Sequence, residues 1–187
     1  MSLDVAWEAL DSSNDPDREV VHYVDLRLMS PDNETRWKRC LLTSDYLASF
    51  LTPNPERDPT EREELSIVID ELLANAVKFS VAPDESVSMA VQHFGDAIRV
   101  EASNLCDERH AKELVEILRR TIEQNLDELF VEQVETNAEE TDRSQLGFIT
   151  LRLNFGARLG ARIREDAETG HYRVTVAVVL DRSVRSA

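Results

Sequence analysis

Cysteine and lysine are scarce in this chain of 187 residues, and several common sequence signals are absent. The two cysteines, Cys40 and Cys106, are too few for a disulfide framework, and neither belongs to a Cys-x-x-Cys pair. We therefore expect two buried thiols. The N-terminus lacks a basic segment followed by an apolar run, and no stretch approaches the about 18 uninterrupted apolar residues of a membrane span. These absences predict a cytoplasmic protein.

Positive charge is also in deficit, because 21 basic residues stand against 37 acidic ones and the formal net charge is -16. The resulting field repels polyanions, so we expect neither nucleic acid nor a membrane surface as a partner. The acidity is typical either of a solvated face or of a docking surface for a basic partner. Charge alone does not separate these two interpretations.

Metal and hydrolase signatures are missing as well. His22, His93, His110 and His171 are scattered, without the Glu or Cys spacing of a metal site. No Gly-x-Ser-x-Gly segment and no Cys-His arrangement indicates a hydrolase. The four histidines are therefore interpreted as surface or strand residues.

The pattern along the chain predicts one domain over residues 1–187. About the first 15 residues are polar, and we expect them to be disordered. Apolar alternation predicts strands over 19–28, which we expect to open the sheet, and over 86–93, 96–103, 161–165 and 171–180. Helical spacing predicts helices over 32–51 and 60–79, one long helix or two over 107–135, a mobile loop over 136–144, and a helix from about 146 to 160. This order favours an α+β fold, a two-layer sandwich of a mainly antiparallel sheet with its helices on one face.

Three different polar side chains share one face of the helix expected over 60–79. Glu71, Asn75 and Lys78 are spaced i, i+4 and i+7, away from the apolar stripe of the same helix. A carboxylate can orient or deprotonate a nucleophile, an amide oxygen can ligate magnesium, and an ammonium can neutralise phosphate charge. The alternative is a solvated outer face on which Glu71 and Lys78 are loosely paired.

The segment Glu71-Leu-Leu-Ala-Asn75-Ala-Val-Lys78-Phe-Ser80 resembles the N-box of the GHKL superfamily, the ATP-binding fold of histidine kinases and anti-sigma-factor kinases. The resemblance implies that ATP and Mg²⁺ are cofactors. It further implies that Glu71 positions or activates the attacking group, that Asn75 holds the magnesium ion, and that Lys78 approaches the phosphates.

Two further segments resemble the family but depart from its glycine motifs. After the strand that ends at Ser103, the family has an Asp-x-Gly-x-Gly turn, whereas this chain has Asn104-Leu-Cys-Asp107 with no glycine. The resemblance implies that Asn104 takes the place of the adenine-reading Asp. The Gly-x-Gly-Leu-Gly phosphate loop is reduced to Gln145-Leu-Gly147-Phe. Gly147 is either the remaining anchor of that loop or a packing or capping residue.

The arrangement is most similar to the SiaB-type regulatory kinases, which also carry a helical insert before a reduced glycine box. That resemblance implies a kinase or ATPase-like enzyme that acts on a small regulatory protein, STAS-like or similar, with the 136–144 loop closing the site. The alternative is a degenerate GHKL module without nucleotide binding, which occupies a partner or forms a homodimer through the long helix.

Overall fold

The computed structural model describes residues 2–10, 20–29, 33–52, 59–82, 85–139 and 146–182. These residues form strands and helices that alternate irregularly along the chain. In chain order they are β1 (Ser2–Val5), α1 (Trp7–Leu10), β2 (His22–Leu28), α2 (Asn33–Leu51), α3 (Pro59–Lys78), β3 (Val87–His93), β4 (Ala97–Cys106), α4 (Glu108–Glu123), α5 (Leu126–Glu139), α6 (Leu146–Phe155), β5 (Arg158–Glu165) and β6 (Tyr172–Asp181).

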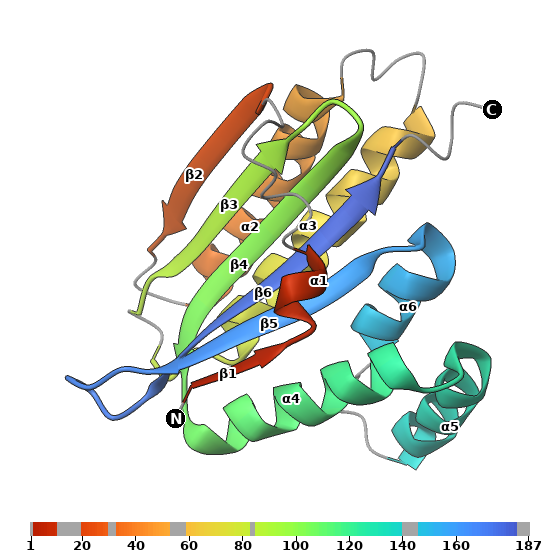
Figure 1. Cartoon of the computed structure of the whole chain (residues 1–187). Helices are drawn as coiled ribbons and strands as arrows, with labels where there is room; N and C mark the ends of the chain where they lie inside the picture. Colours follow the sequence, from red (N-terminus) through yellow and green to blue (C-terminus); the bar gives the residue numbers. More distant parts are fainter. Residues whose placement is uncertain are drawn as a thin grey trace.

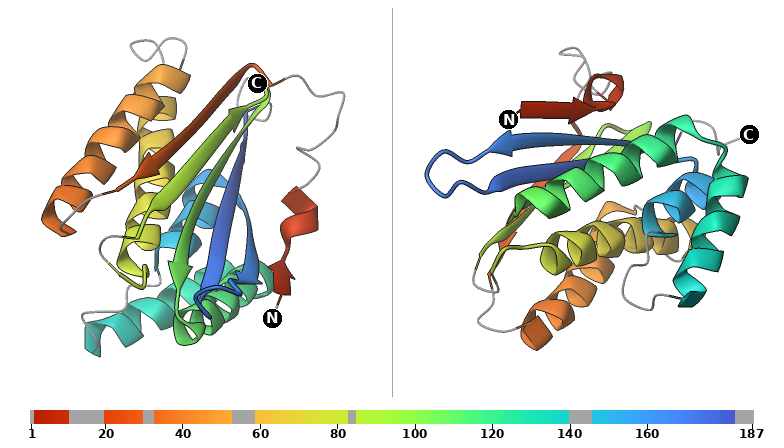
Figure 2. Two further views of the ribbon diagram at one scale, coloured as in Figure 1. Left: turned by 90° about the vertical axis from the view of Figure 1, so that its left-hand side faces the viewer. Right: turned by 90° about the horizontal axis from the view of Figure 1, so that it is seen from below.

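The strands form one six-stranded sheet in the order β1-β5-β6-β4-β3-β2. Every pair of neighbouring strands is antiparallel. Helices α2, α3, α4 and α6 lie on one face of this sheet, and α5 packs against α6 (Figures 1 and 2). The α+β class and the two-layer arrangement predicted from the sequence are therefore confirmed.

Most of the predicted elements are present within a few residues of their expected bounds. Strands β2, β3, β4 and β6 and helices α2 and α3 all occur where the alternation and the helical spacing placed them. The β3–β4 hairpin turns at Gly95, whose φ of +82° favours glycine. The second hairpin has Gly170 at φ +70°. Both turns were predicted from their glycines.

Several sequence-based expectations are wrong. Residues 2–10 are ordered as β1 and α1, and β1, not the strand at 19–28, is the first strand of the sheet; residues 11–19 lie outside the described residues. Of the two alternatives for 107–135, one long helix or two, the structure has two helices. The loop expected over 136–144 is wrong for residues 136–139, which belong to α5, and 140–144 lie outside the described residues. Helix α6 ends at Phe155, before Gly156 at φ +62°, and not at Gly160.

The two faces of the sheet carry separate apolar clusters. On β6, Val176 and Val178 belong to the main core beneath the helices, together with the buried stripe of α3. Ala177 and Val179 point to the opposite face and pack with Trp7 of α1. Because α1 covers that opposite face, the expectation that all helices share one face is wrong for this short helix. No helix among the described residues is long and apolar enough to cross a membrane.

Candidate functional site

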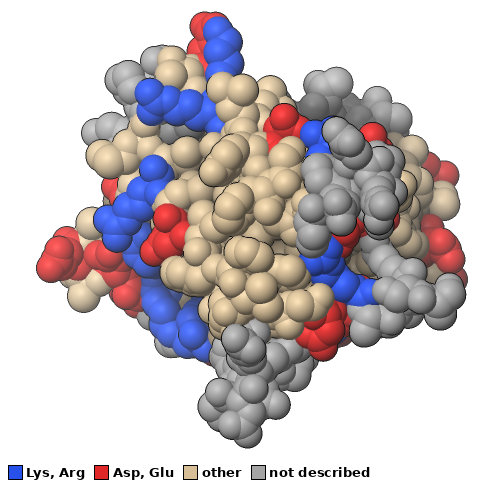
Figure 3. All heavy atoms as spheres, turned by 90° about the horizontal axis from the view of Figure 1, so that it is seen from above, with Lys and Arg blue, Asp and Glu red and all other residues tan. Residues whose placement is uncertain are grey.

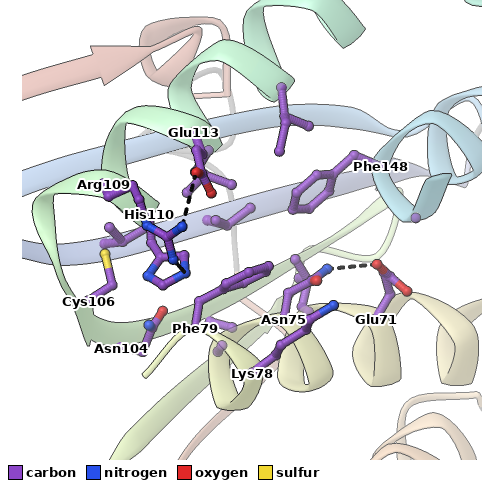
Figure 4. A pocket seen from close by; sticks show the side chains of 18 residues that line it. Glu71, Asn75, Lys78, Phe79, Asn104, Cys106, Arg109, His110, Glu113 and Phe148 are labelled. Carbon is purple, nitrogen blue, oxygen red and sulfur yellow. Dashed lines mark hydrogen bonds and ion pairs between the residues drawn. The ribbon is translucent and has the colours of Figure 1, made fainter. Parts of the chain in front are cut away.

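A cavity of about 390 Å³ lies between α3, α4, the start of α6 and the inner face of strands β4 and β6 (Figure 4). All five residues that the sequence suggested for a site line this cavity: Glu71, Asn75, Lys78, Asn104 and Gly147. They come from α3, β4 and α6, which are far apart along the chain. The fold therefore gathers the predicted residues around one space.

Helix α3 supplies one wall of the cavity. Its apolar residues Leu72, Leu73 and Ala76 are buried, which fixes the rotation of the helix about its axis. That rotation turns Glu71 and Asn75 toward the cavity, where Asn75 Nδ2 donates a hydrogen bond to Glu71 Oε1 over 2.7 Å (Figure 4). Because the amide nitrogen is engaged in this bond, the Asn75 Oδ1 oxygen is the atom suited to ligate a cation.

Lys78 lies at the rim, one turn after Asn75. Its side chain is exposed, and its Nζ is 5.5 Å from the centroid of the Phe79 ring. An ammonium at the mouth of a cavity suits an anionic ligand that reaches toward solvent.

Gly147 touches Glu71 directly. A Cβ built at position 147 would lie 1.7 Å from Glu71 Oε1, closer than any two such atoms can approach. The absence of a side chain at 147 is therefore what lets the Glu71 carboxylate occupy its position against α6. This contact gives Gly147 a packing role, and it leaves open whether the same residue also anchors a phosphate.

Burial changes the acidity of Glu71. Desolvation raises the pKa of its carboxyl above the usual value, with a smaller upward contribution from the charge of Asp70. The hydrogen bond from Asn75 and the charge of Lys78 oppose this shift. A carboxylate with a raised pKa is a stronger base, which suits a group that accepts a proton from an attacking hydroxyl.

Asn104 lies at the far end of the cavity from Glu71. It is buried on β4, opposite Val174 of β6, and its Nδ2 donates to the Leu105 carbonyl over 3.4 Å. Ala102 and Cys106 flank it on the same face of the strand and also line the cavity. Burial raises the pKa of the Cys106 thiol to about 12, so it stays protonated and unreactive.

The first turns of α4 form the wall opposite α3, and sequence reasoning missed them. Arg109, His110 and Glu113 line the cavity, with Arg109 Nη1 3.9 Å from a Glu113 carboxylate oxygen. The His110 ring lies 5.3 Å from the Phe79 ring, so it bridges α4 and α3 across the mouth (Figure 4). The sequence signal was the N-cap Asp107, whose Oδ1 accepts from the His110 backbone nitrogen and fixes where α4 begins.

The residues present fit a magnesium nucleotide. The cavity volume lies in the range of small-molecule sites, about 300–1,000 Å³. Its floor includes Ala102, Val174 and Val176, an apolar surface for a base, and Lys78 and Arg109 bring positive charge to its edge. The described residues contain no cluster of three His, Cys, Asp or Glu side chains for a metal. A magnesium ion in this cavity would be held by the Asn75 side chain together with phosphates and water.

Comparisons with known proteins show similarity in structure and not in sequence. No protein-family model matches the chain, and the search of curated proteins finds no match. Among solved structures, a chain in the crystal structure of the SiaB–SiaC complex from Pseudomonas aeruginosa superimposes with a TM-score of 0.60 and 14% identity. The alignment covers 93% of this chain and 98% of that chain. At this identity the likeness shows the fold, and this chain has a SiaB-like fold.

Proposed function

We propose that this protein is an ATP- and magnesium-binding regulatory protein kinase of the SiaB type, which acts on a small regulatory partner protein. The observation that carries the proposal is that five residues chosen from sequence motifs all line one cavity of about 390 Å³. The likeness to a chain of a two-protein complex supports a protein partner. We further infer that the protein is cytoplasmic.

Four of the five residues have a direct role in this proposal, and Gly147 leaves room for the Glu71 carboxylate. The bound nucleotide supplies the phosphoryl group, and magnesium neutralises its charge. Glu71 accepts the proton of the partner's attacking hydroxyl, a task that its raised pKa favours. Asn75 holds the metal through Oδ1, while Lys78 at the rim attracts the phosphates. Asn104, at the buried end of the cavity, recognises the base by hydrogen bonding.

The second candidate function is a regulatory module that has lost nucleotide binding. One observation favours it: β4 continues through Cys106 and α4 begins at Glu108, so only Asp107 separates strand and helix. The family has a glycine turn at this point, which gives the backbone freedom to approach a ligand. In this alternative the protein acts by occupying its partner.

Calorimetric titration with a non-hydrolysable ATP analogue, with and without magnesium, separates the two candidates. We expect magnesium-dependent binding to the native protein and its loss in Asn75→Ala. The melting temperature of that variant should stay within about 5 °C of the native value, because the change lies at the cavity surface. Glu63→Ala, an exposed site on the same helix, is the matched control and should bind normally.

Two results would overturn the kinase proposal or part of it. Absence of binding by the native protein at about millimolar analogue, roughly 4 kcal/mol of binding free energy, would leave only the regulatory module. A collapse of the melting temperature in Asn75→Ala would show that Asn75 is a structural residue. If binding is found, transfer of labelled γ-phosphate to a copurified small protein is the next measurement.

A further inference from the structure

The outer edge of β2 has an open apolar layer. β2 is the last strand of the sheet, and among the described residues no strand pairs with its outer side. On the helix-facing side, Val24 and Leu26 are only half-buried, whereas their β3 partners Val91 and Met89 are fully buried. The apolar layer of the sheet therefore reaches the last strand without being fully covered there by the described residues.

Helix α2 extends this apolar layer. Leu42, Tyr46 and Phe50 are spaced i, i+4 and i+8, so they form one stripe along the helix, and their exposed fractions are 73%, 65% and 48%. The rings of Tyr46 and Phe50 lie 6.2 Å apart, and Phe50 contacts the ring of His22 at the start of β2, 5.6 Å between centroids. The stripe thus meets the edge strand.

The other end of the stripe is also tied to the strand. Arg39, one turn before the stripe, donates a hydrogen bond to the carbonyl of Met29 just after β2. Helix α2 therefore runs antiparallel to β2, as Figure 2 shows from the side of this edge. Seen from the end at which β2 begins, uncharged residues cover a broad central area, with charged residues around it (Figure 3).

The sequence of β2 is complementary to a second copy of itself. If two β2 strands pair antiparallel with Leu26 opposite Leu26, Asp25 of each copy lies opposite Arg27 of the other. In the same register Tyr23 lies opposite Met29, two side chains that are 58% and 61% exposed in the single chain. Both charged positions are exposed, so nothing has to be unfolded to form these pairs.

Other registers of this strand pair match charged and apolar side chains less well. Centring the pair on Asp25 puts the two Asp25 carboxylates opposite each other, and centring it on Arg27 does the same with two guanidinium groups. A shift by a single residue would put apolar and polar side chains on the same face. Only the register centred on Leu26 matches apolar with apolar and acid with base.

We propose that two copies of this chain form a two-fold symmetric dimer in which their β2 strands pair antiparallel about Leu26, joining the two sheets into one. The α2 stripe of Leu42, Tyr46 and Phe50 packs against the partner's α2 on the same face. A two-fold axis suits this surface because antiparallel pairing of identical strands is self-complementary. The cavity lies over β4 and β6 and stays open, so the proposal does not depend on the proposed function.

Sedimentation equilibrium of the full chain, together with light scattering, tests the dimer. The native protein should have about twice the chain mass of 21.3 kDa at micromolar concentration. Asp25→Arg and Arg27→Asp should each weaken the dimer at least about 10-fold, because each places like charges opposite one another twice. The double variant exchanges the charges and should dimerise as the native protein does.

Mixing the two single variants gives a sharper result. A strand with two positive side chains then meets a strand with two negative ones. The mixture should therefore form a heterodimer at concentrations where each variant alone is monomeric. Circular dichroism confirms that both variants are folded. A native monomer at about 100 µM, or single variants that dimerise as the native chain does, would overturn the proposal. A dimer lost only on changing the outer face of α4 would place the interface there instead and also overturn it.

Discussion

The Glu71 carboxylate lies against the backbone of Gly147, so close that a Cβ at position 147 would lie 1.7 Å from Glu71 Oε1. The contact joins the middle of α3 to the first turn of α6 and holds the carboxylate at one end of the cavity. The hydrogen bond from Asn75 Nδ2 fixes the same Glu71 oxygen. Glu71 is thus restrained from two sides before any ligand binds.

Gly147→Ala is expected to displace the Glu71 side chain without unfolding the protein. Alanine is favoured over glycine in a helix by about 1 kcal/mol, and losing the Glu71–Asn75 hydrogen bond costs about the same. The net change in unfolding free energy should therefore be near zero. In a Glu71→Ala background, where no carboxylate is displaced, the same substitution should stabilise by about 1 kcal/mol.

The native protein, the two single variants and the double variant form a double-mutant cycle. Urea unfolding of these four proteins gives the coupling energy between positions 71 and 147. Equal stabilisation by Gly147→Ala in both backgrounds would mean that Glu71 does not occupy the place seen here. Titration with the ATP analogue provides a second measurement. Gly147→Ala should weaken magnesium-dependent binding if Glu71 must be held in position for the ligand.

Glu71→Gln should make the protein more stable at neutral pH. Burial raises the pKa of Glu71 in the folded protein above its value of 4.5 in the unfolded chain. Between those two pKa values the folded state binds more protons, so stability falls as pH rises through the window and the loss persists above it. Glutamine carries no charge and retains an oxygen that accepts from Asn75, so it avoids this loss.

Melting temperatures measured from pH 4.5 to 8 test this prediction. The advantage of Glu71→Gln should be largest at the alkaline end and shrink as pH falls toward 4.5. Glu63→Gln, exposed on the same helix, should show no such pH-dependent advantage. A gain that is constant with pH would point to packing and not to the buried charge.

The sequence predicted the cavity residues well where local periodicity decides their direction. Glu71, Asn75 and Lys78 share a helix face because three and four residues make one turn. Asn104 faces the same space because alternate residues of β4 point toward the helices, as its buried neighbours Ala102 and Cys106 do. Motif resemblance selected these positions, and periodicity was enough to place them together.

The parts that the sequence did not reveal depend on long-range contacts. β1 alternates polar and apolar residues but is only four residues long, and it is stabilised by pairing with β5, where Asp4 accepts from Arg164 at 2.7 Å. The local sequence does not predict that this segment pairs with β5, which lies far away along the chain. Arg109 and His110 line the cavity because α4 packs across the sheet at a particular angle, which the helical spacing of α4 alone does not determine. Tertiary packing decided these features.

Asp107→Ala should destabilise the protein by about 1 kcal/mol and also weaken ligand binding. Asp107 is the N-cap of α4, and its Oδ1 accepts from the His110 backbone nitrogen over 2.8 Å. Loss of the cap frays the turn that carries Arg109 and His110 into the cavity. Asp107→Asn keeps a capping oxygen and is the matched control, so it should retain most of the stability.

Chemical unfolding and calorimetric titration of both variants separate capping from charge. If Asp107→Asn loses as much stability as Asp107→Ala, the carboxylate charge near His110 is what stabilises the turn. That result would contradict the capping explanation. Equal binding by Asp107→Ala and the native protein would show that the first turn of α4 does not contribute to the site.

His93 makes the stability of the fold depend on pH. Its Nε2 is 2.7 Å from an Arg182 guanidinium nitrogen, and its Nδ1 is 3.2 Å from His22 Nδ1. The guanidinium can only donate, so His93 Nε2 has to be the acceptor and the ring is neutral in this arrangement. Burial lowers the pKa of His93, and the neighbouring His22 lowers it further, against a smaller opposing effect of the Gly95 backbone.

The unfolded chain therefore binds a proton at His93 more readily than the folded protein does. The stabilisation that depends on neutral His93 should be complete above pH 6.5, the usual pKa of a histidine. The free energy of unfolding should fall as pH drops below that value toward the lowered pKa of His93. His93→Gln should flatten this part of the pH profile in urea unfolding, whereas His171→Gln, in the β5–β6 turn, should leave it unchanged. A glutamine at position 93 cannot titrate in this range. If the unfolding free energy of His93→Gln still falls with pH as steeply as that of the native protein, the acid sensitivity belongs to other groups.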